Sequence, residues 1–413
     1  NAIKESVKNL PNAIVCLDAD CSLTYSMSKE IPNKIITFGV NVPFDKNGNI
    51  SNTKRIDESL KTIRYLLQKN AKIIIVSHLG RPKGMKKSEY SLKPVVKYLS
   101  QVLNRKIIFV TDDIRENVPQ ILNNLRDGDI AVLENIRFYK EEELNDEIFS
   151  KKLASLADVY VNDAFGTVHR AHASTQGVTK YLPSVCGFLI KKEIDVLGQL
   201  LSVPKHPFVA ILGGAKVSDK IGVICNLLDK VDTLIIAGGM AYTFLNALGY
   251  SIGSSIFEPD KVVLAKDIIA KAKDLGVRLV LPVDNVVGKE FKSDTEFMIV
   301  NSDSIPDGYV GLDIGAKTKE IFVETIKNAK TIFWNGPVGV FEWANFRRGT
   351  LEITKAIANS DAVTVIGGGD SIAAVDLLGF TDKITHISTG GGASLEFLEG
   401  KDLPGILSLD EKI

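Results

Sequence analysis

Near its midpoint the chain reads Phe208-Val209-Ala210-Ile211-Leu212-Gly213-Gly214-Ala215-Lys216-Val217-Ser218-Asp219-Lys220. The apolar run at the start predicts a buried strand, the glycines predict a tight turn, and the residues from Val217 onward predict a helix. Glycine at a helix N-terminus lets backbone N–H groups approach a phosphate, and the helix dipole favours the negative charge. The stretch therefore predicts an α/β fold with an anion site where a strand ends.

Two lysines strengthen the functional interpretation of this turn. Lys216 and Lys220 are four residues apart, so a helix from Val217 would bring both cations to its first turn. Two cations there oppose the helix dipole and need an anion to become favourable. The alternative is an ordinary turn with solvated lysines. The turn is not a Walker A loop, because the Gly-Lys-Ser/Thr ending is absent.

A second glycine turn, Gly367-Gly368-Gly369-Asp370-Ser371, follows the predicted strand Val363–Ile366. Asp370 could hold a divalent metal, or it could simply cap the following helix. A further triplet, Gly390-Gly391-Gly392, also follows a predicted strand and favours a ligand-binding role. Neither triplet has the Gly-x-Gly-x-x-Gly spacing, which disfavours a dehydrogenase.

Composition sets broad limits. At 413 residues the chain is too long for one compact core, so we expect two domains. Its 50 basic and 50 acidic residues balance, which disfavours nucleic acid as a partner. No apolar run reaches the about 20 residues of a membrane helix, so no membrane partner is expected. The first ten residues lack the apolar core of a signal peptide, and we expect a cytoplasmic protein with four free thiols: Cys16, Cys21, Cys186 and Cys225.

Short β-branched runs alternate with longer amphipathic ones, which predicts parallel sheets covered by helices on both faces. We expect an N-terminal lobe over residues 1–187, a hinge helix and proline-bounded linker over 188–207, and a C-terminal lobe over 208–397. The predicted strands are Lys72–Val76, Lys106–Thr111, Ala131–Leu133, Val159–Val161, Phe208–Leu212, Thr233–Ala237, Arg278–Leu281, Thr331–Trp334, Val363–Ile366 and Thr385–Ser388.

The first half carries cationic side chains just after several of these strands: His78, Arg81, Arg137, His169, Arg170 and His172. A single arginine is most often a surface residue with a solvated head. Several at consecutive strand ends should converge at one sheet edge, where guanidinium groups suit carboxylate and phosphate. Metal binding by His169 and His172 is the alternative, but further ligands are lacking. Phosphate turns in one half and cations in the other suit phosphoryl transfer between an anionic substrate and a nucleotide.

Together these motifs resemble phosphoglycerate kinases. Eleven matching strings occur in the family's order from about residue 34 onward: Asn41–Pro43, Arg55-Ile56, Ser77–Pro82, Leu133–Phe138, Asn162–Gly166, His169–His172, Gly213–Val217, Gly311–Gly315, Trp334–Pro337, Gly367–Asp370 and Ser388–Ala393. The resemblance implies two Rossmann-like αβα lobes with parallel sheets, joined by a hinge helix, and a C-terminal tail from about residue 398 that returns to the first lobe. It also implies a monomer.

The implied reaction moves a phosphoryl group between 1,3-bisphosphoglycerate and ADP, giving 3-phosphoglycerate and ATP, with Mg2+. The resemblance implies a substrate patch of Asn41, Arg55, His78, Arg81, Arg137 and Arg170. It implies a nucleotide side of Gly214, Lys216, Lys220, Gly238, Gly311, Asn335, Glu342, Gly368, Gly369, Asp370 and Ser371, with Asp370 at the metal. Its implied catalytic groups are Arg55, Lys216, Gly368 and Gly391.

Two departures from the family pattern leave an alternative open. The family's first strand runs Arg-x-Asp-x-Asn-x-Pro, whereas this chain has Thr37 and Gly39 in place of the arginine and the aspartate. The chain also carries extra residues before this strand, and Asp18 or Asp20 could fill the missing carboxylate's place. The alternative function is a catalytically impaired family member that binds nucleotide and acts as an interaction protein.

Overall fold

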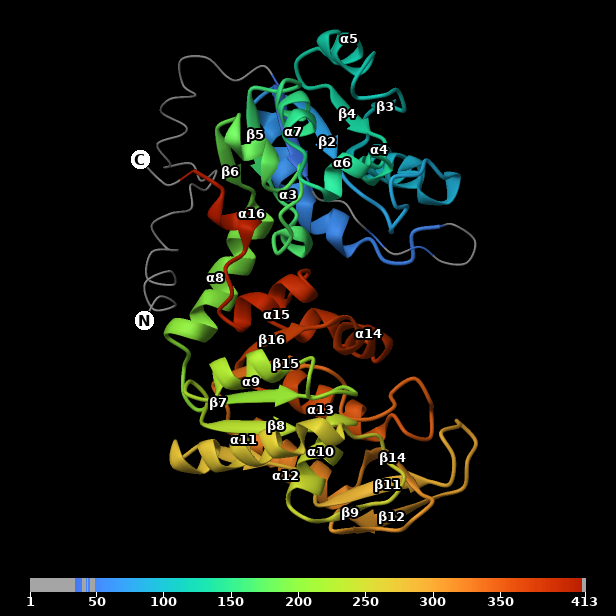
Figure 1. Ribbon diagram of the computed structural model, residues 1–413, viewed down its shortest axis with the longest axis vertical. Coiled ribbons are helices and arrows are strands. Elements are labelled where there is room, and N and C mark those ends of the chain that lie inside the picture. The colour runs from blue at the N-terminus through green and yellow to red at the C-terminus, as the bar shows by residue number, and fades with distance from the viewer. Residues whose placement is uncertain (1–33, 39–41, 43, 45–48, 411–413) are drawn as a thin grey trace. The chain divides into compact units, whose positions relative to one another are not determined.

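The computed structural model describes residues 34–38, 42, 44 and 49–410. These residues form two compact units, each with its own six-stranded sheet (Figure 1). The first unit contains the described residues up to Asp195 and those from Asp402 onward, and the second is Val196–Lys401. Helix α8 (Phe188–Ser202) carries the chain from the first unit into the second.

The first unit is built on a parallel sheet with the strand order β3-β4-β2-β1-β5-β6. Its central strands are buried on both faces, which explains why they read as continuous apolar runs and not as alternating patterns. The strands are β1 (Lys34–Phe38), β2 (Lys72–Val76), β3 (Ile107–Val110), β4 (Ile130–Leu133), β5 (Val159–Asn162) and β6 (Ser184–Cys186).

Helices of the first unit bury one apolar face against this sheet. In α3, Ile56, Leu60 and Ile63 recur at helical spacing and join the core formed by the strands. The helices described before α8 are α3 (Lys54–Gln68), α4 (Lys93–Leu103), α5 (Val118–Asn123), α6 (Lys140–Glu143) and α7 (Glu147–Ala154).

The last described residues complete the first unit. Helix α16 (Pro404–Leu407) lies in this segment, and the side chain of Asn162 donates a hydrogen bond to the carbonyl oxygen of Gly405 at 3.0 Å. Asp410 N donates to Ser184 O at 2.9 Å, and Ser184 N donates to a carboxylate oxygen of Asp410 at 2.7 Å. The segment is therefore hydrogen-bonded to the last residue of β5 and to the first residue of β6.

The second unit has a parallel sheet with the strand order β10-β8-β7-β15-β16-β17. Right-handed crossovers put the helices that follow β7 and β8 on one face and those that follow β15 and β16 on the other. Its strands are β7 (Phe208–Leu212), β8 (Thr233–Ile236), β10 (Arg278–Val280), β15 (Thr331–Asn335), β16 (Val363–Gly367) and β17 (His386–Ile387). Its helices are α9 (Ile221–Leu227), α10 (Met240–Ala247), α11 (Val262–Asp274), α12 (Ala316–Lys327), α13 (Arg348–Ala358), α14 (Gly369–Leu377) and α15 (Gly392–Leu398).

Not every sheet is parallel, so that expectation was incomplete. The second unit also holds an antiparallel sheet with the order β12-β11-β14, formed by β11 (Asp284–Gly288), β12 (Phe297–Asn301) and β14 (Val310–Ile314). Its edge strand β12 is mostly exposed, so its apolar residues do not show the buried pattern that marks the other strands. A short parallel pair, β9 (Ser251–Ile252) and β13 (Ser304–Ile305), was missed as well.

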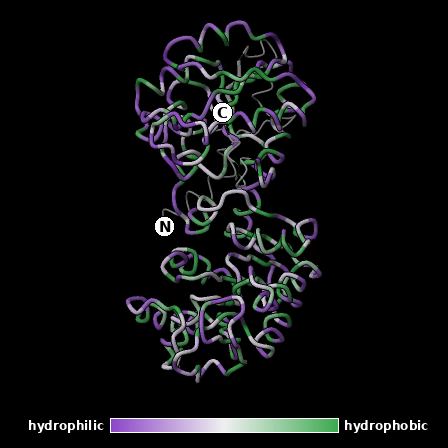
Figure 2. Tube along the Cα trace, turned by 90° about the vertical axis from the view of Figure 1, so that its right-hand side faces the viewer, coloured by the Kyte–Doolittle hydropathy of each residue, from purple (hydrophilic) through white to green (hydrophobic). Residues whose placement is uncertain are grey.

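Each strand predicted between Lys72 and Ser388 is present, and no end differs from its predicted position by more than one residue. Figure 2 shows apolar and hydrophilic residues interleaved along the trace of each unit. Among the described residues, none of the helices has both the length and the apolar character needed to cross a membrane. Asp18 and Asp20 lie outside the described residues, as do Cys16 and Cys21.

Candidate active site

Basic side chains gather at the carboxyl edge of the first unit's sheet. His78 follows β2, Arg137 follows β4, and Arg170 lies in the loop after β5. The pKa of the buried His78 is held well below its usual range by burial and then by the positive charges of Arg137, Arg170 and Arg55, with a contribution from His172. The expected convergence is therefore real for these groups, and His78 is neutral near pH 7.

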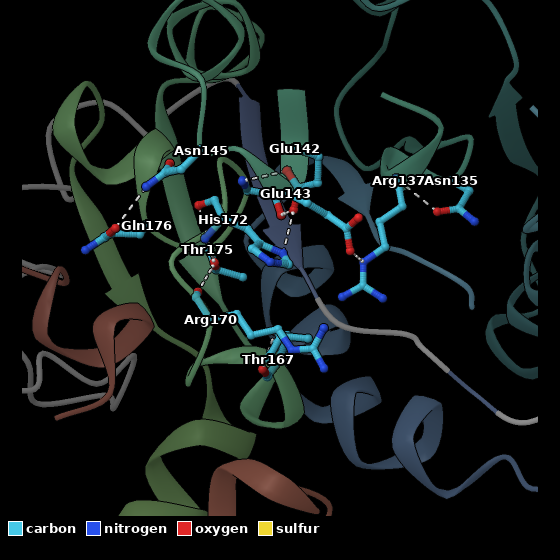
Figure 3. Close-up of polar contacts among 12 residues, drawn as sticks. Asn135, Arg137, Glu142, Glu143, Asn145, Thr167, Arg170, His172, Thr175 and Gln176 are labelled. Carbon is cyan, nitrogen blue, oxygen red and sulfur yellow. Dashed lines mark hydrogen bonds and ion pairs between the residues drawn. The ribbon is translucent and has the colours of Figure 1, made fainter. Parts of the chain in front are cut away.

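Arg137 is fixed by its surroundings. Its side chain is 5% exposed, and its Nη1 donates to the carbonyl oxygen of Gly80 at 2.9 Å. Its Nε lies 3.5 Å from a carboxylate oxygen of Glu143 (Figure 3). Asn135 accepts a hydrogen bond from Arg137 N at 3.1 Å. Burial, and then the charge of Arg170, lower the pKa of Arg137. A bound anion would stabilise the charged form of Arg137 and so oppose both effects on its pKa.

The other predicted substrate residues differ in exposure. Arg55 is half-buried in the first turn of α3, where burial lowers its pKa, and Arg81 is exposed. Arg170 is also half-buried, and its Nε donates to His169 Nε2 at 3.2 Å. Asn41 lies outside the described residues, as does Gly39. Arg81 also lowers the pKa of Arg137, so all four arginines belong to one positively charged region.

The glycine turns of the second unit interlock at the carboxyl edge of its sheet. Gly213 N donates to Asn335 O at 2.9 Å, and Gly214 N donates to Pro337 O at 3.1 Å. Met240 N donates to Gly214 O at 2.9 Å. The turns after β7, β8 and β15 therefore support one another through backbone contacts.

These contacts separate two kinds of glycine. A Cβ on Gly213, Gly238 or Gly336 would overlap backbone atoms of a neighbouring turn, so packing requires those glycines. A Cβ on Gly214 or Gly369 would meet nothing within 4 Å. Gly214 has a φ of +102°, and Gly369 begins α14. Open backbone at Gly214 and Gly369 is what a phosphate group needs in order to approach. By contrast, Gly311 packs against Tyr242.

Gly336→Ala is expected to lower the Tm by about 4–8 °C, since left-handed backbone in a non-glycine residue plus a backbone overlap costs at least about 2 kcal/mol. The control is Gly369→Ala, which adds the same methyl group in open space and should leave the Tm within about 2 °C. Thermal unfolding followed by circular dichroism measures both. Equal shifts would contradict the distinction between packed and open glycines.

The second turn is a strand-to-helix turn, as predicted. β16 ends at Gly367, and α14 begins at Gly369 after Gly368, which has a φ of +87°. Asp370 is exposed in the first turn and makes no capping hydrogen bond, so its simple capping role is excluded. The Ser371 hydroxyl accepts a hydrogen bond from Gly336 N at 2.6 Å. The start of α14 is thereby attached to the turn after β15.

An amide group lies beside this helix start. Asn335 is 1% exposed, and its Nδ2 has no hydrogen-bond partner among the described residues. A Cβ placed on Gly368 would lie 3.0 Å from that nitrogen. Its Oδ1 accepts from the ammonium group of Lys220. A buried donor with no partner is costly, and an anionic ligand at this turn would satisfy it.

The expected helix from Val217 is wrong. α9 begins only at Ile221, because residues 213–220 pack as a turn on the neighbouring loops and Glu258 holds Ser218 N and Oγ at 3.0 and 2.6 Å. Lys216 and Lys220 therefore do not share a helical turn. Lys220 is 9% exposed and its pKa is lowered by burial, whereas Lys216 is exposed and has no hydrogen bond or ion pair with the described part of the chain.

The remaining predicted positions are spread along the second unit. Glu342 is exposed in the loop after β15, and Gly391 precedes α15 with a φ of +56°. Sequence reasoning missed Asp219, whose charge acts on Lys220 together with that of Asp370. In the described ranges no group of three His, Cys, Asp or Glu side chains could hold a metal alone.

Comparison with known proteins is decisive. The sequence profile described as phosphoglycerate kinase matches residues 33–401. The chain belongs to the phosphoglycerate kinase family. It is 59% identical to the phosphoglycerate kinase of Clostridium botulinum over 375 residues, which is 90% of this chain and 94% of the relative. It is 58% identical to that of Clostridium perfringens, with the same coverage.

Solved phosphoglycerate kinases also share its fold. The Coxiella burnetii structure matches with a TM-score of 0.83 and 42% identity, covering 91% of this chain and 95% of that one. The Pyrococcus horikoshii structure matches with a TM-score of 0.79 and 33% identity, covering 91% and 96%. The predicted family and fold class are both confirmed.

Proposed function

We propose that the chain is a phosphotransferase with a carboxyl acceptor, which moves a phosphoryl group reversibly from 1,3-bisphosphoglycerate to ADP in glycolysis. The observation that carries the proposal is the set of arginines around the buried, neutral His78, because such a region favours a ligand with several negative charges. Family membership supports the same reaction. A coupled assay that follows ATP formation tests it, and no turnover with these substrates would refute it.

The proposed half-sites divide the chemistry. Arg55, Arg137 and Arg170 would bind the phosphoglycerate, with His78, Arg81 and Asn41 beside them. Open backbone at Gly214 and Gly368–Ser371, with Lys216, Lys220 and Asn335, would bind the nucleotide phosphates. Gly238, Gly311 and Glu342 would lie around the nucleoside, and Gly391 would border the transferring group.

In the direction of ATP consumption, a carboxylate oxygen of 3-phosphoglycerate forms a bond to the γ-phosphorus of ATP. The bond from that phosphorus to the bridging oxygen breaks, and ADP leaves with the electron pair. The carboxylate is already ionised near pH 7, so no general base is needed. The protein's task is positioning, exclusion of water and neutralisation of charge on the phosphoryl oxygens. Arginine, lysine and backbone N–H groups supply it.

Mg2+ fits the residues present. It usually binds to proteins through one or two carboxylates and completes its shell with substrate phosphates and water. Asp370 is an exposed carboxylate at the start of α14, and the charge of Asp219 acts on the same lysine. We propose that Asp370 holds the ion, which would neutralise phosphate charge when bound.

The proposal also covers a hinge movement, the cellular location and the oligomeric state. Transfer requires reacting atoms about 3–3.5 Å apart and shielded from water, so we include a hinge movement that brings the two substrates together. We place the enzyme in the cytoplasm as a monomer. Nothing observed favours the impaired alternative.

Gly39→Asp is expected to lower KM for 3-phosphoglycerate by up to about tenfold, because a carboxylate can accept a hydrogen bond from the substrate hydroxyl. The gain is limited by repulsion from the substrate's own charges. KM for ATP should not change, and steady-state kinetics with each substrate varied in turn measures both. An unchanged KM for 3-phosphoglycerate would mean that position 39 does not replace the family's aspartate.

A further inference from the structure

Glu142 is a buried carboxylate for which the phosphoryl-transfer chemistry has no use. It lies in α6 and is 1% exposed. Its Oε2 accepts a hydrogen bond from Ser174 N at 3.0 Å, and its Oε1 accepts one from the Ser174 hydroxyl at 2.6 Å. Its own backbone oxygen accepts from Ala173 N at 2.9 Å. Three hydrogen bonds thus join this residue to one short segment of another loop.

That segment carries Arg170. Thr175 Oγ1 donates to the carbonyl oxygen of Arg170 at 2.7 Å, and His172 N donates to the same oxygen at 3.1 Å. Gln176 N donates to His172 O at 2.8 Å. The loop from Arg170 to Gln176 is therefore held together internally. Wherever Ser174 is fixed, the backbone of Arg170 is fixed with it.

The carboxylate does not act through His172. His172 Nδ1 is 3.7 Å from Glu142 Oε1, too far for a hydrogen bond. Burial, and then the charges of Arg137 and Arg170, lower the pKa of His172 to about 4, so the ring is neutral near pH 7. Within the described residues, the hydrogen-bond donors to the Glu142 side chain are the N–H and hydroxyl groups of Ser174.

Its neighbour in sequence has a parallel contact. The carboxylate of Glu143 lies 3.5 Å from Arg137 Nε (Figure 3). Of two consecutive carboxylates of α6, one therefore contacts Arg137 and the other contacts the loop that carries Arg170. Glu143 contacts its arginine directly, and its side chain is 41% exposed. Glu142 is buried and reaches the other arginine only through the loop backbone.

We propose that Glu142 is a positioning residue for the phosphoglycerate half-site: through Ser174 it fixes the loop that aims Arg170 at the substrate. The inference rests on the proposed function, in which Arg170 binds 3-phosphoglycerate. It assigns Glu142 no contact with substrate or with the transferring group.

Glu142→Gln tests this role with little change in size. Burial raises the pKa of Glu142 to about 7, so near neutral pH the substitution removes only part of a negative charge. Glutamine keeps the size but offers one accepting oxygen where Ser174 requires two. We expect KM for 3-phosphoglycerate to rise about tenfold, the effect of losing a hydrogen bond to a charged group. The kcat at saturating substrate and KM for ATP should stay within about twofold.

Glu141→Gln is the matched control. It makes the same change one residue earlier, at a side chain that pairs with Arg115 at 3.2 Å on the surface, and it should leave all kinetic constants unchanged. Ser174→Ala should raise KM in the same direction. The double variant of Glu142→Gln and Ser174→Ala should be no worse than Glu142→Gln alone, because both act through one contact.

Arg170→Ala separates the two proposals, and calorimetric titration with 3-phosphoglycerate supplies a readout besides turnover. If Arg170→Ala weakens binding while Glu142→Gln and Ser174→Ala do not, the positioning role is refuted and the proposed function stands. If Arg170→Ala leaves binding unchanged, both the assignment of Arg170 and the role of Glu142 fall. Should Glu142→Gln fail to fold, as judged by thermal unfolding, Ser174→Ala decides the question.

Discussion

Replacing Lys216 by alanine is expected to lower kcat by about 100- to 1000-fold, the usual cost of removing one donor that acts mainly in the transition state. The lysine is exposed in the turn after β7, and no partner among the described residues competes for its charge. An ammonium group without a competing partner can interact with the negative charge that develops on the transferring phosphoryl group. The binding of ATP, which many backbone groups share, should weaken by less than tenfold.

Steady-state kinetics and nucleotide titration measure the two effects separately. Lys271→Ala is the control, because Lys271 is an exposed lysine of α11 in the same unit and has no place in the proposed site. A Lys216→Ala enzyme that turns over within a few-fold of the parent would remove Lys216 from the catalytic groups.

Arg55→Ala is expected to cost about 100-fold or more in kcat while the protein remains folded. Arg55 lies in the first turn of α3 and is half-buried, and burial lowers its pKa. A partly desolvated guanidinium interacts more strongly with an incoming anion than a solvated one does. Arg55→Lys should restore little activity, since an ammonium group cannot reproduce two parallel hydrogen bonds.

Arg64→Ala serves as the control for this series, because Arg64 is an exposed arginine on the same helix. Its activity should match that of the parent. Full activity in the Arg55→Lys enzyme would mean that position 55 contributes charge alone, and full activity in Arg55→Ala would exclude it from the site.

The sequence predicts the parallel sheets well because their strands are buried on both faces. Runs such as Ile73–Val76 and Phe208–Leu212 are apolar throughout and are followed by turn residues, so both signals agree. The antiparallel sheet was not predicted because β12 is exposed, and because Asp284, Asn285 and Gly288 in β11 and Gly311 and Asp313 in β14 interrupt the apolar pattern of those buried strands. A continuous apolar run therefore predicts a buried strand, whereas a strand that is exposed or interrupted by polar residues and glycines gives no such signal.

The candidate site was predictable only in part, for a related reason. Strand ends located Arg137 and Gly368, because parallel strands bring their carboxyl ends to one edge. The true start of α9 depended on contacts with Glu258, 40 residues away from Ser218. The partnership of Glu142 with Ser174 spans 32 residues and follows no motif. Local patterns cannot report contacts made between distant loops.

The return of the last residues to the first unit has a consequence for synthesis. A ribosome delivers the chain from its N-terminus, so the second unit is available in full before Gly405 and Asp410 emerge. Until then Asn162 lacks the carbonyl that accepts its amide hydrogen bond, and Ser184 lacks both of its contacts with Asp410. The unit that begins first is therefore finished last.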